Sequence, residues 1–341
     1  MKLEILEGLP VIGGQAYDLV FGIYTDEGDP IKQIEKDHGK YMHMNIVSMD
    51  RSYFAHTHPI WQGRPNKESN IFKLTVNSPT VEFDNFQAPV ALPTKGAYML
   101  YSEVVPKGSH APSVAEYKLE VLSGPDPSPT VQDDKVGHDM TISKYLKMGK
   151  KGTAETAETT HEEYQLKATI KSSVMDMGDK KMIHFDFQLF RKHQMAGHKM
   201  DMPIKYKELI NWLGMPGHAI LVSENHDDFF HLHYPDMKHQ GGDGQHSMLE
   251  VDPETTQFRF MLAVNKDKYD HFKKKNFSIW AQFRIFDTDG APEINSHGMV
   301  DPSVANSRIS TIPFRFNLED LKNKKGSGDD YGRGEHGHDM H

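Results

Sequence analysis

Alternation of apolar and polar residues is the dominant pattern along the chain. In GGQAYDLVFGIYTDEGDP, residues 13–30, the apolar positions Leu19, Phe21 and Ile23 are separated by single residues before a turn-forming end. GDKKMIHFDFQLF, residues 178–190, alternates in the same way. A period of two residues is typical of a strand with one buried face. The pattern therefore predicts β-strands in both halves of the chain.

Four further segments have strand character. They are KGAYMLYSEV (95–104), AEYKLEVL (115–122), KNFSIWAQFRI (275–285) and STIPFRFNL (310–318). Gly, Pro, Asn and Asp punctuate the intervening sequence, as turns require. Many short strands with frequent turn signals favour an all-β fold, and we expect two tandem immunoglobulin-like antiparallel β-sandwich domains. YKELINWLG (206–214) is expected to form a short helix or a turn.

The chain also contains a long-range repeat. YMHMNIVSMDRSYFAHTHP (41–59) aligns with GHAILVSENHDDFFHLHYP (217–235) without a gap over sixteen residues when the first histidines are superposed. The aligned histidines are His43 with His218, His56 with His231 and His58 with His233. Similarity at such a large offset indicates a duplicated domain.

The repeat suggests a division of the chain into domains. We expect β-sandwich domains at 1–123 and 164–323, joined by a linker at 124–163 with one helical turn near SKYLKM (143–148). The linker contains GPDPSPTVQDD and GKKGTAETAETTHEE, which have little to bury. The histidine-containing tail 324–341 has the composition of a disordered segment.

Hairpin geometry gathers the histidines of each repeat. An antiparallel hairpin around the central Asp-Arg pair would place His43 opposite His58 and Asn45 opposite His56. Since side chains alternate between faces, the three histidines would share one face, while Met44 and its apolar neighbours face the core. Opposed Cβ atoms lie about 4.5–5.5 Å apart, so the imidazoles can converge on one metal ion.

The same register in the second repeat groups His218, His231 and His233, with Ala219 and Leu221 on the core face. We therefore predict two metal sites with three histidines each. The alternative is that these histidines are surface or edge residues bonded to the backbone or water.

Composition favours copper as the metal. The chain has 21 histidines and 19 methionines but no cysteine, so disulfides and thiolate ligands are excluded. Imidazole and thioether suit copper as Cu(I) or Cu(II), and zinc is the alternative for a site made of histidines. The net charge of −9, without a basic stripe, argues against a nucleic-acid partner.

A further candidate metal group lies in RKHQMAGHKMDMP (191–203). Its members are His193, Met195, His198, Met200 and Met202. This mixture of imidazole and thioether suits Cu(I). The alternative is a flexible insertion in which methionine is an adaptable filler.

The sequence gives little support for an enzyme. It has no phosphate-binding glycine loop, no G-x-S-x-G motif and no HExxH motif. A metal-dependent enzyme stays open as a less favoured alternative, because three-histidine zinc sites catalyse hydration and hydrolysis when one coordination position is open.

The second repeat resembles a family pattern. GMPGHAILVSENHDDFFHLHYP resembles bacterial secreted immunoglobulin-type domains of the YtkA-like and FixH-like kind, in which a "GH" strand and an "F-x-H-x-HP" strand are followed by "G-x-Y". The first repeat matches at Phe54, His56, His58 and Pro59, then at Gly96 and Tyr98. The resemblance implies a small exported β-sandwich associated with copper handling.

The expected function follows from these observations. We expect a periplasmic or secreted protein that binds copper for storage, transfer or tolerance, with a protein partner for transfer. No apolar run reaches the roughly 18 residues of a membrane span. MKLEILEGLP lacks the apolar stretch of a signal peptide, so a cytoplasmic location is the alternative. The rival function is a structural or protein-interaction module with incidental histidines.

Overall fold

The structure is a computed structural model of the whole chain. It describes residues 1–37, 39–51, 53–63, 68–76, 90, 92, 95–109, 111–123, 142–145, 156–161, 166–195, 198–210, 215–234, 237–239, 246–248, 251–286, 307–317 and 323–324. Antiparallel sheets dominate these residues, so the all-β prediction is confirmed. None of the described helices is long and apolar enough to cross a membrane.

Ten strands form two sheets in the first half of the chain, residues 1–145. One sheet has the order β1-β2-β7-β6, and the other has the order β10-β5-β4-β8-β3 with β9 also paired to β8. The strands are β1 (Lys2–Glu7), β2 (Tyr17–Tyr24), β3 (Ile34–Glu35), β4 (His43–Ser48), β5 (Tyr53–Thr57), β6 (Ile60–Trp61), β7 (Ile71–Val76), β8 (Gly96–Pro106), β9 (Ser113–Val121) and β10 (Ile142–Tyr145).

The second half, residues 156–324, contains two large sheets and one small one. Their orders are β11-β12-β13-β14, with β19 and β22 added to it, β16-β15-β20-β21, and the separate pair β17-β18. The strands are β11 (Thr156–His161), β12 (Leu166–Asp176), β13 (Lys180–Met195), β14 (His198–Pro203), β15 (Gly217–Ser223), β16 (Phe229–Tyr234), β17 (Met237–His239), β18 (His246–Met248), β19 (Phe258–Asn265), β20 (Asn276–Phe286), β21 (Ser307–Asn317) and β22 (Asn323–Lys324).

Each half encloses its own hydrophobic core between two sheets. In the first half, Leu19 and Phe21 of β2 meet Met44 and Ile46 of β4. In the second half, the alternating apolar residues of β13 pack with Leu221 of β15. These are the strand faces that the apolar alternation predicted, because a strand with one buried face places every second residue in the core.

The two histidine-containing hairpins have the predicted register. In the first, β4 and β5 place Asn45 opposite His56 and Met44 opposite Thr57. In the second, β15 and β16 place His218 opposite His233. Each hairpin is extended on its other side by a long strand, β8 in the first half and β20 in the second.

The segment expected to be a linker, 124–163, contains two strands. β10 pairs with β5, and β11 pairs with β12, so this segment extends one sheet in each half. The helical turn predicted near residues 143–148 is wrong for residues 143–145, which belong to β10. β10 pairs with the side of β5 that does not face β4, which supplies hydrogen-bonding partners to backbone groups of β5. The tail beyond residue 324 lies outside the described residues.

Helical structure is sparse in the described part of the chain. Within YKELINWLG the structure has the 3-10 helix η2 (Tyr206–Glu208). The α-helix α1 (Lys266–Phe272) was not predicted from the sequence. Only Tyr269 and Phe272 of α1 are buried, so its apolar stripe is too short to give a clear helical period.

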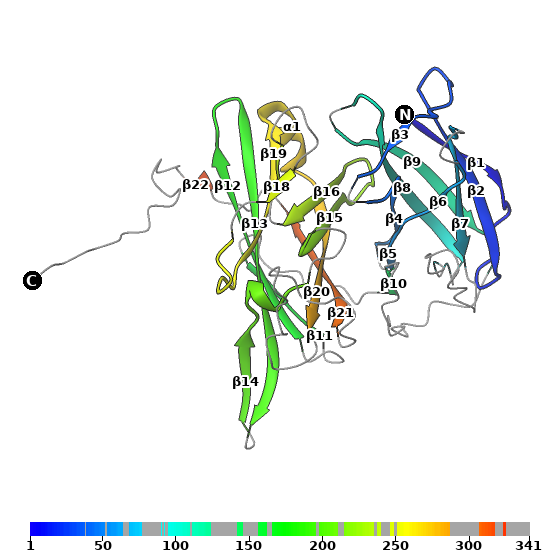
Figure 1. Cartoon of the computed structure of the whole chain (residues 1–341). Helices are drawn as coiled ribbons and strands as arrows, with labels where there is room; N and C mark the ends of the chain where they lie inside the picture. The colour runs from blue at the N-terminus through cyan, green and yellow to red at the C-terminus, as the bar shows by residue number, and fades with distance from the viewer. Residues whose placement is uncertain are drawn as a thin grey trace, which may run out of the picture.

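The two halves meet through their inner sheets. β4, β5 and β8 lie beside β15, β16 and β20 where the blue-to-cyan half approaches the green-to-orange half (Figure 1). An apolar cluster joins them: Val47, Phe54 and Tyr101 from the first half pack with Ile220, Val222 and Trp280 from the second. The rings of Phe54 and Trp280 stack with centroids 5.3 Å apart. The four larger sheets among the described residues are therefore joined by three apolar clusters, one within each half and one between the halves.

Candidate metal centre

The first histidine triad lies at the end of the β4–β5 hairpin farthest from its turn. His43, His56 and His58 are 2%, 0% and 4% exposed. One nitrogen from each imidazole can be chosen so that the three lie within 4.8 Å of one another. The ring centroids of His43 and His56 each lie 4.9 Å from that of His58. The predicted group therefore comes together in a buried position.

The second triad repeats this arrangement on β15 and β16. His218, His231 and His233 also offer nitrogens within 4.8 Å of one another. The centroid of the His233 ring lies 5.2 Å from that of His218 and 4.6 Å from that of His231. Both triads are thus groups of three histidines that could hold a metal ion.

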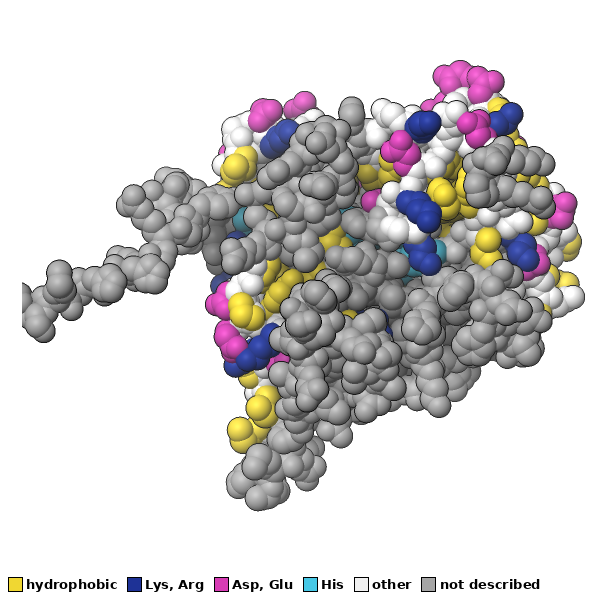
Figure 2. Space-filling view, viewed as in Figure 1, with side chains coloured by type: hydrophobic (Ala, Val, Ile, Leu, Met, Phe, Trp, Pro, Cys, Tyr) yellow, Lys and Arg dark blue, Asp and Glu magenta, His cyan; other side chains and the backbone are white. Residues whose placement is uncertain are grey.

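The two triads face each other across the contact between the halves. The centroid of the His231 ring lies 5.8 Å from that of His43 and 5.6 Å from that of His56. His56 and His218 are separated by 6.1 Å between centroids. These distances are close to those within each triad. In Figure 2, viewed as in Figure 1, a few histidine atoms are visible where the two halves meet.

Sequence reasoning did not predict that the histidine faces are covered. The available signal was the apolar residues that share these faces: Val47 and Phe54 in the first hairpin, and Ile220 and Val222 in the second. A strand with apolar residues on both faces is expected to be buried on both sides. His43, His56, His58 and His218 are therefore part of an interior layer, while His231 and His233 are partly exposed.

The backbone near the first hairpin orients His43. Its Nε2 lies 3.0 Å from the carbonyl oxygen of Asp37. Because a carbonyl oxygen only accepts hydrogen bonds, Nε2 carries the hydrogen in the neutral imidazole. Nδ1 then keeps the lone pair that a metal ligand needs.

A side chain from the opposite half orients His56. The Nδ1 of His56 lies 3.1 Å from the Oε1 of Gln282 on β20. With the amide oxygen accepting, Nδ1 carries the hydrogen and Nε2 keeps the lone pair. Gln282 therefore fixes the tautomer of a histidine that belongs to the other sheet.

His231 is held by a carboxylate from the first half. Its Nδ1 donates to the Oε2 of Glu103 on β8 over 2.6 Å. Both side chains are buried. The Nε2 of His231 is also buried and has no hydrogen-bond partner among the described residues. A metal-ligating histidine commonly donates its other ring N–H to a carboxylate, which orients the ring and makes it more basic.

Burial keeps the imidazoles of His43, His56, His58 and His218 uncharged at neutral pH. Desolvation lowers the pKa of His43 to about 4, and repulsion from His231 acts in the same direction. Desolvation also holds the pKa of His56, His58 and His218 well below 6.5, and neighbouring histidines add to the effect. A neutral imidazole is the form that binds metal, so protons compete weakly with a metal ion here.

The predicted methionine-containing group lies on the β13–β14 hairpin. Its register pairs His193 with Met200 and Met195 with His198, and Met202 lies opposite Arg191. The side chains of Met200 and Met202 are 53% and 48% exposed. The side chains of residues 192–199 lie outside the described part. The register places the five candidates at facing positions of one ribbon.

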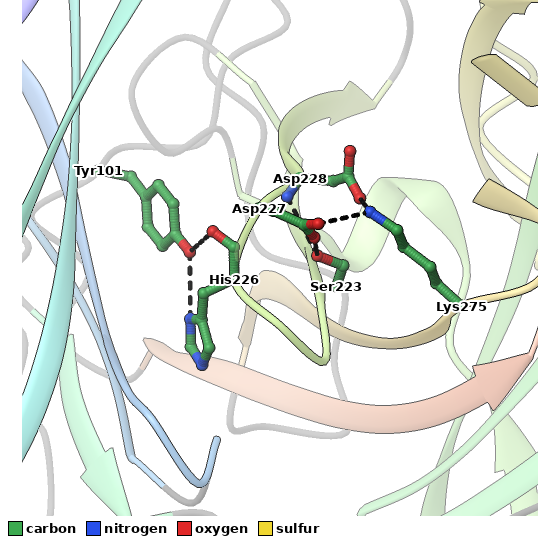
Figure 3. Close-up of polar contacts among 6 residues, drawn as sticks. All are labelled: Tyr101, Ser223, His226, Asp227, Asp228 and Lys275. Atoms are coloured by element: carbon green, nitrogen blue, oxygen red, sulfur yellow. Dashed lines mark hydrogen bonds and ion pairs between the residues drawn. The ribbon is translucent and has the colours of Figure 1, made fainter. Parts of the chain in front are cut away.

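A third group of acidic and histidine residues is explained without a metal. Asp227, Asp228 and His271 offer ligand atoms close together. However, the Nζ of Lys275 lies 2.7 Å from a carboxylate oxygen of Asp227 and 2.6 Å from one of Asp228. The lysine ammonium therefore already provides the positive charge between the two carboxylates (Figure 3).

The turn that carries these carboxylates also connects the two halves. The hydroxyl of Tyr101 on β8 donates to the carbonyl oxygen of His226 over 3.1 Å (Figure 3). The Nε2 of His226 lies 3.2 Å from the carbonyl oxygen of Met49 in the turn of the first hairpin. The turns of the two hairpins thus contact one another beside the apolar cluster.

Comparison with known families covers the first half only. Residues 3–122 match the model described as Domain of unknown function (DUF8832). The match includes the first triad and Glu103. No curated protein matches the chain.

Proposed function

We propose that the protein binds copper through the two triads His43/His56/His58 and His218/His231/His233. The observation that carries this proposal is the gathering of six histidines, in groups of three, at one contact between sheets, with His43, His56, His58 and His218 buried. In His43, His56 and His231, one ring nitrogen donates a hydrogen bond, to Asp37, Gln282 and Glu103 respectively. The second ring nitrogen of each would be the one that binds a metal ion.

The ligand chemistry favours copper over zinc. Sites made of nitrogen donors bind Cu(II) more tightly than Zn(II) in the general order of divalent ions, and imidazole also ligates Cu(I). The abundance of methionine in the same chain fits a protein that meets Cu(I). Such a site would serve copper storage, copper transfer or copper tolerance. Transfer would require a protein partner that receives the copper.

Two finer proposals accompany this function. The matching registers of β4–β5 and β15–β16 support an origin of the two halves by tandem duplication. The resemblance to secreted immunoglobulin-type domains supports a periplasmic or secreted location.

The test is a copper titration of the full chain in which the tail histidines are removed by His336→Ala, His338→Ala and His341→Ala. Cu(II) is followed by EPR and Cu(I) by competition with a chelator, with Zn(II) as competitor. We expect sub-micromolar copper binding that is lost in the quadruple variant His56→Ala/His58→Ala/His231→Ala/His233→Ala.

The matched control is His184→Ala, which removes a buried histidine from β13, outside both triads. It should bind copper like the parent protein. Unchanged binding in the quadruple variant would reject these sites. Absence of copper binding in the parent protein would favour the alternative of a protein-interaction module. Tighter binding of Zn(II) than of copper would identify zinc as the metal of these sites.

We further propose that the β13–β14 hairpin is a weaker, exposed Cu(I) site. Exposed thioethers at Met200 and Met202 support this, because soft ligands select Cu(I). The variant Met200→Leu/Met202→Leu should lose a weak Cu(I) equivalent in chelator competition while the tight equivalents persist. Retention of every equivalent would show that the hairpin is not a ligand.

A further inference from the structure

We propose that the two triads form one binuclear copper centre, in which the two ions lie close together between the facing hairpins. This inference rests on the proposed function, since it requires that both triads bind copper. It goes further because two separate mononuclear sites would satisfy that function equally well.

Distances between the rings support one centre. Within the triads, ring centroids lie between 4.6 Å and 5.8 Å apart. Between the triads, three pairs lie at 5.6 Å, 5.8 Å and 6.1 Å. His231 is close to two histidines of the first triad as well as to its own. Two ions bound by these rings would therefore lie close to one another, as in two-metal sites with separations of about 3.5–4 Å.

Each half also orients a ligand of the other half. Gln282 of the second half accepts from His56 of the first, and Glu103 of the first half accepts from His231 of the second. These are the outer hydrogen bonds that typically set the tautomer and direction of a metal-ligating imidazole. Neither triad is therefore fully oriented without the opposite sheet.

The charge of the ions bears on their oxidation state. Glu103 is the buried carboxylate beside the two triads. Two Cu(II) ions would bring two more positive charges to this place than two Cu(I) ions. Excess charge in a buried region is costly, so two Cu(I) ions should bind more readily than two Cu(II) ions.

The experiment loads the full chain carrying the three tail substitutions with one or two equivalents of Cu(I), removes excess metal and oxidises the bound copper. The EPR spectrum is then compared at both loadings, and X-ray absorption of the reduced form reports copper–copper scattering. We expect two bound ions, a copper–copper scattering distance of about 4 Å, and loss or strong broadening of the Cu(II) signal at two equivalents.

Variants that disable one triad provide the comparison. His56→Gln/His58→Gln and His231→Gln/His233→Gln keep polar side chains of similar size. Each should bind one tight copper with an uncoupled Cu(II) spectrum. If a variant fails to fold, the comparison of one and two equivalents in the parent protein still decides the question.

Three outcomes would overturn the binuclear centre. If two ions bind and their EPR spectrum equals the sum of two isolated Cu(II) signals, the protein binds copper at two separate mononuclear sites and the binuclear centre is rejected. One ion that is lost when either triad is disabled would indicate a single site shared by the triads. Absence of any bound copper would reject the proposed function together with this inference.

Discussion

At the scale of single residues, the sequence predicted which histidines come together but not what orients them. His56 and His58 are one residue apart, so strand alternation alone puts them on one face. Their partners are far away in the chain: Gln282 lies 226 positions after His56, and Glu103 lies 128 positions before His231. Contacts of this kind depend on how two sheets pack, which local periodicity does not encode.

Replacement of Glu103 should weaken metal binding without removing a ligand. Glu103→Ala removes the acceptor of His231, and we expect copper affinity to fall about 10- to 100-fold. Glu103→Gln keeps an acceptor oxygen but removes the charge, so its effect should be smaller. Isothermal titration with a competing chelator measures both. Glu120→Gln, on an exposed position of β9, is the control, and equal loss in this variant would contradict a specific role for Glu103.

The apo protein should lose stability as the pH falls. The pKa of His43 is lowered to about 4 in the folded protein, and those of His56, His58 and His218 lie well below the ordinary value of about 6.5. The unfolded chain therefore binds more protons over this range, so the free energy of unfolding rises with pH. This stability is present above about pH 6.5 and is lost as the pH falls toward 4.

Urea denaturation of the apo protein at a series of pH values measures this effect. The midpoint should fall steadily between pH 7 and pH 4.5, and the fall should be shallower in His56→Gln/His58→Gln. A midpoint independent of pH over this range would contradict the burial of neutral imidazoles.

At the scale of elements, strand alternation predicted most of the framework. The register of both hairpins follows from placing apolar residues such as Met44 and Leu221 on the core face, because a slip of one residue would expose them. β10 and β11 were missed because they lie in polar sequence and are strands only by pairing with β5 and β12. β-propensity depends strongly on such neighbours.

The β15–β16 turn should depend on Lys275. Its ammonium lies between Asp227 and Asp228, and the Asp228 side chain is largely buried. Lys275→Met leaves this carboxylate without its cation, so we expect a loss of about 2 kcal/mol in the free energy of unfolding, measured in urea. Lys273→Met, which removes the more exposed pair with Asp270, should have a much smaller effect, because solvent screens the exposed pair. Equal effects would contradict this account of the turn.

At the scale of the whole molecule, the sequence indicated two sandwiches but not their arrangement. The apolar cluster around Trp280 and the six histidines occupy the same contact between inner sheets. Trp280 lies in a segment that the sequence identified only as a strand. Recognising it as a contact residue requires the fold, because its neighbours Val47 and Phe54 belong to the other half.

Loss of Trp280 should affect both stability and copper binding. Trp280→Ala removes the ring stacked on Phe54, and we expect a cost of about 3–5 kcal/mol in the free energy of unfolding. Copper affinity should fall as well, because the sheets that orient His56 and His231 lose their packing. Trp61→Ala, a partly buried tryptophan in the outer sheet of the first half, is the matched control and should retain copper affinity. If copper affinity were unchanged in Trp280→Ala, the packing of the two halves would not be needed to orient the copper ligands.

Because the ligands lie on two halves of one polypeptide, copper affinity should not depend on the protein concentration. A site completed by separate subunits weakens on dilution, because the subunits dissociate. Here the halves are tethered, so closure of the site is a unimolecular step with a fixed effective concentration. Copper affinity should therefore be the same at nanomolar and at micromolar protein, and the protein could retain its metal where it is itself scarce.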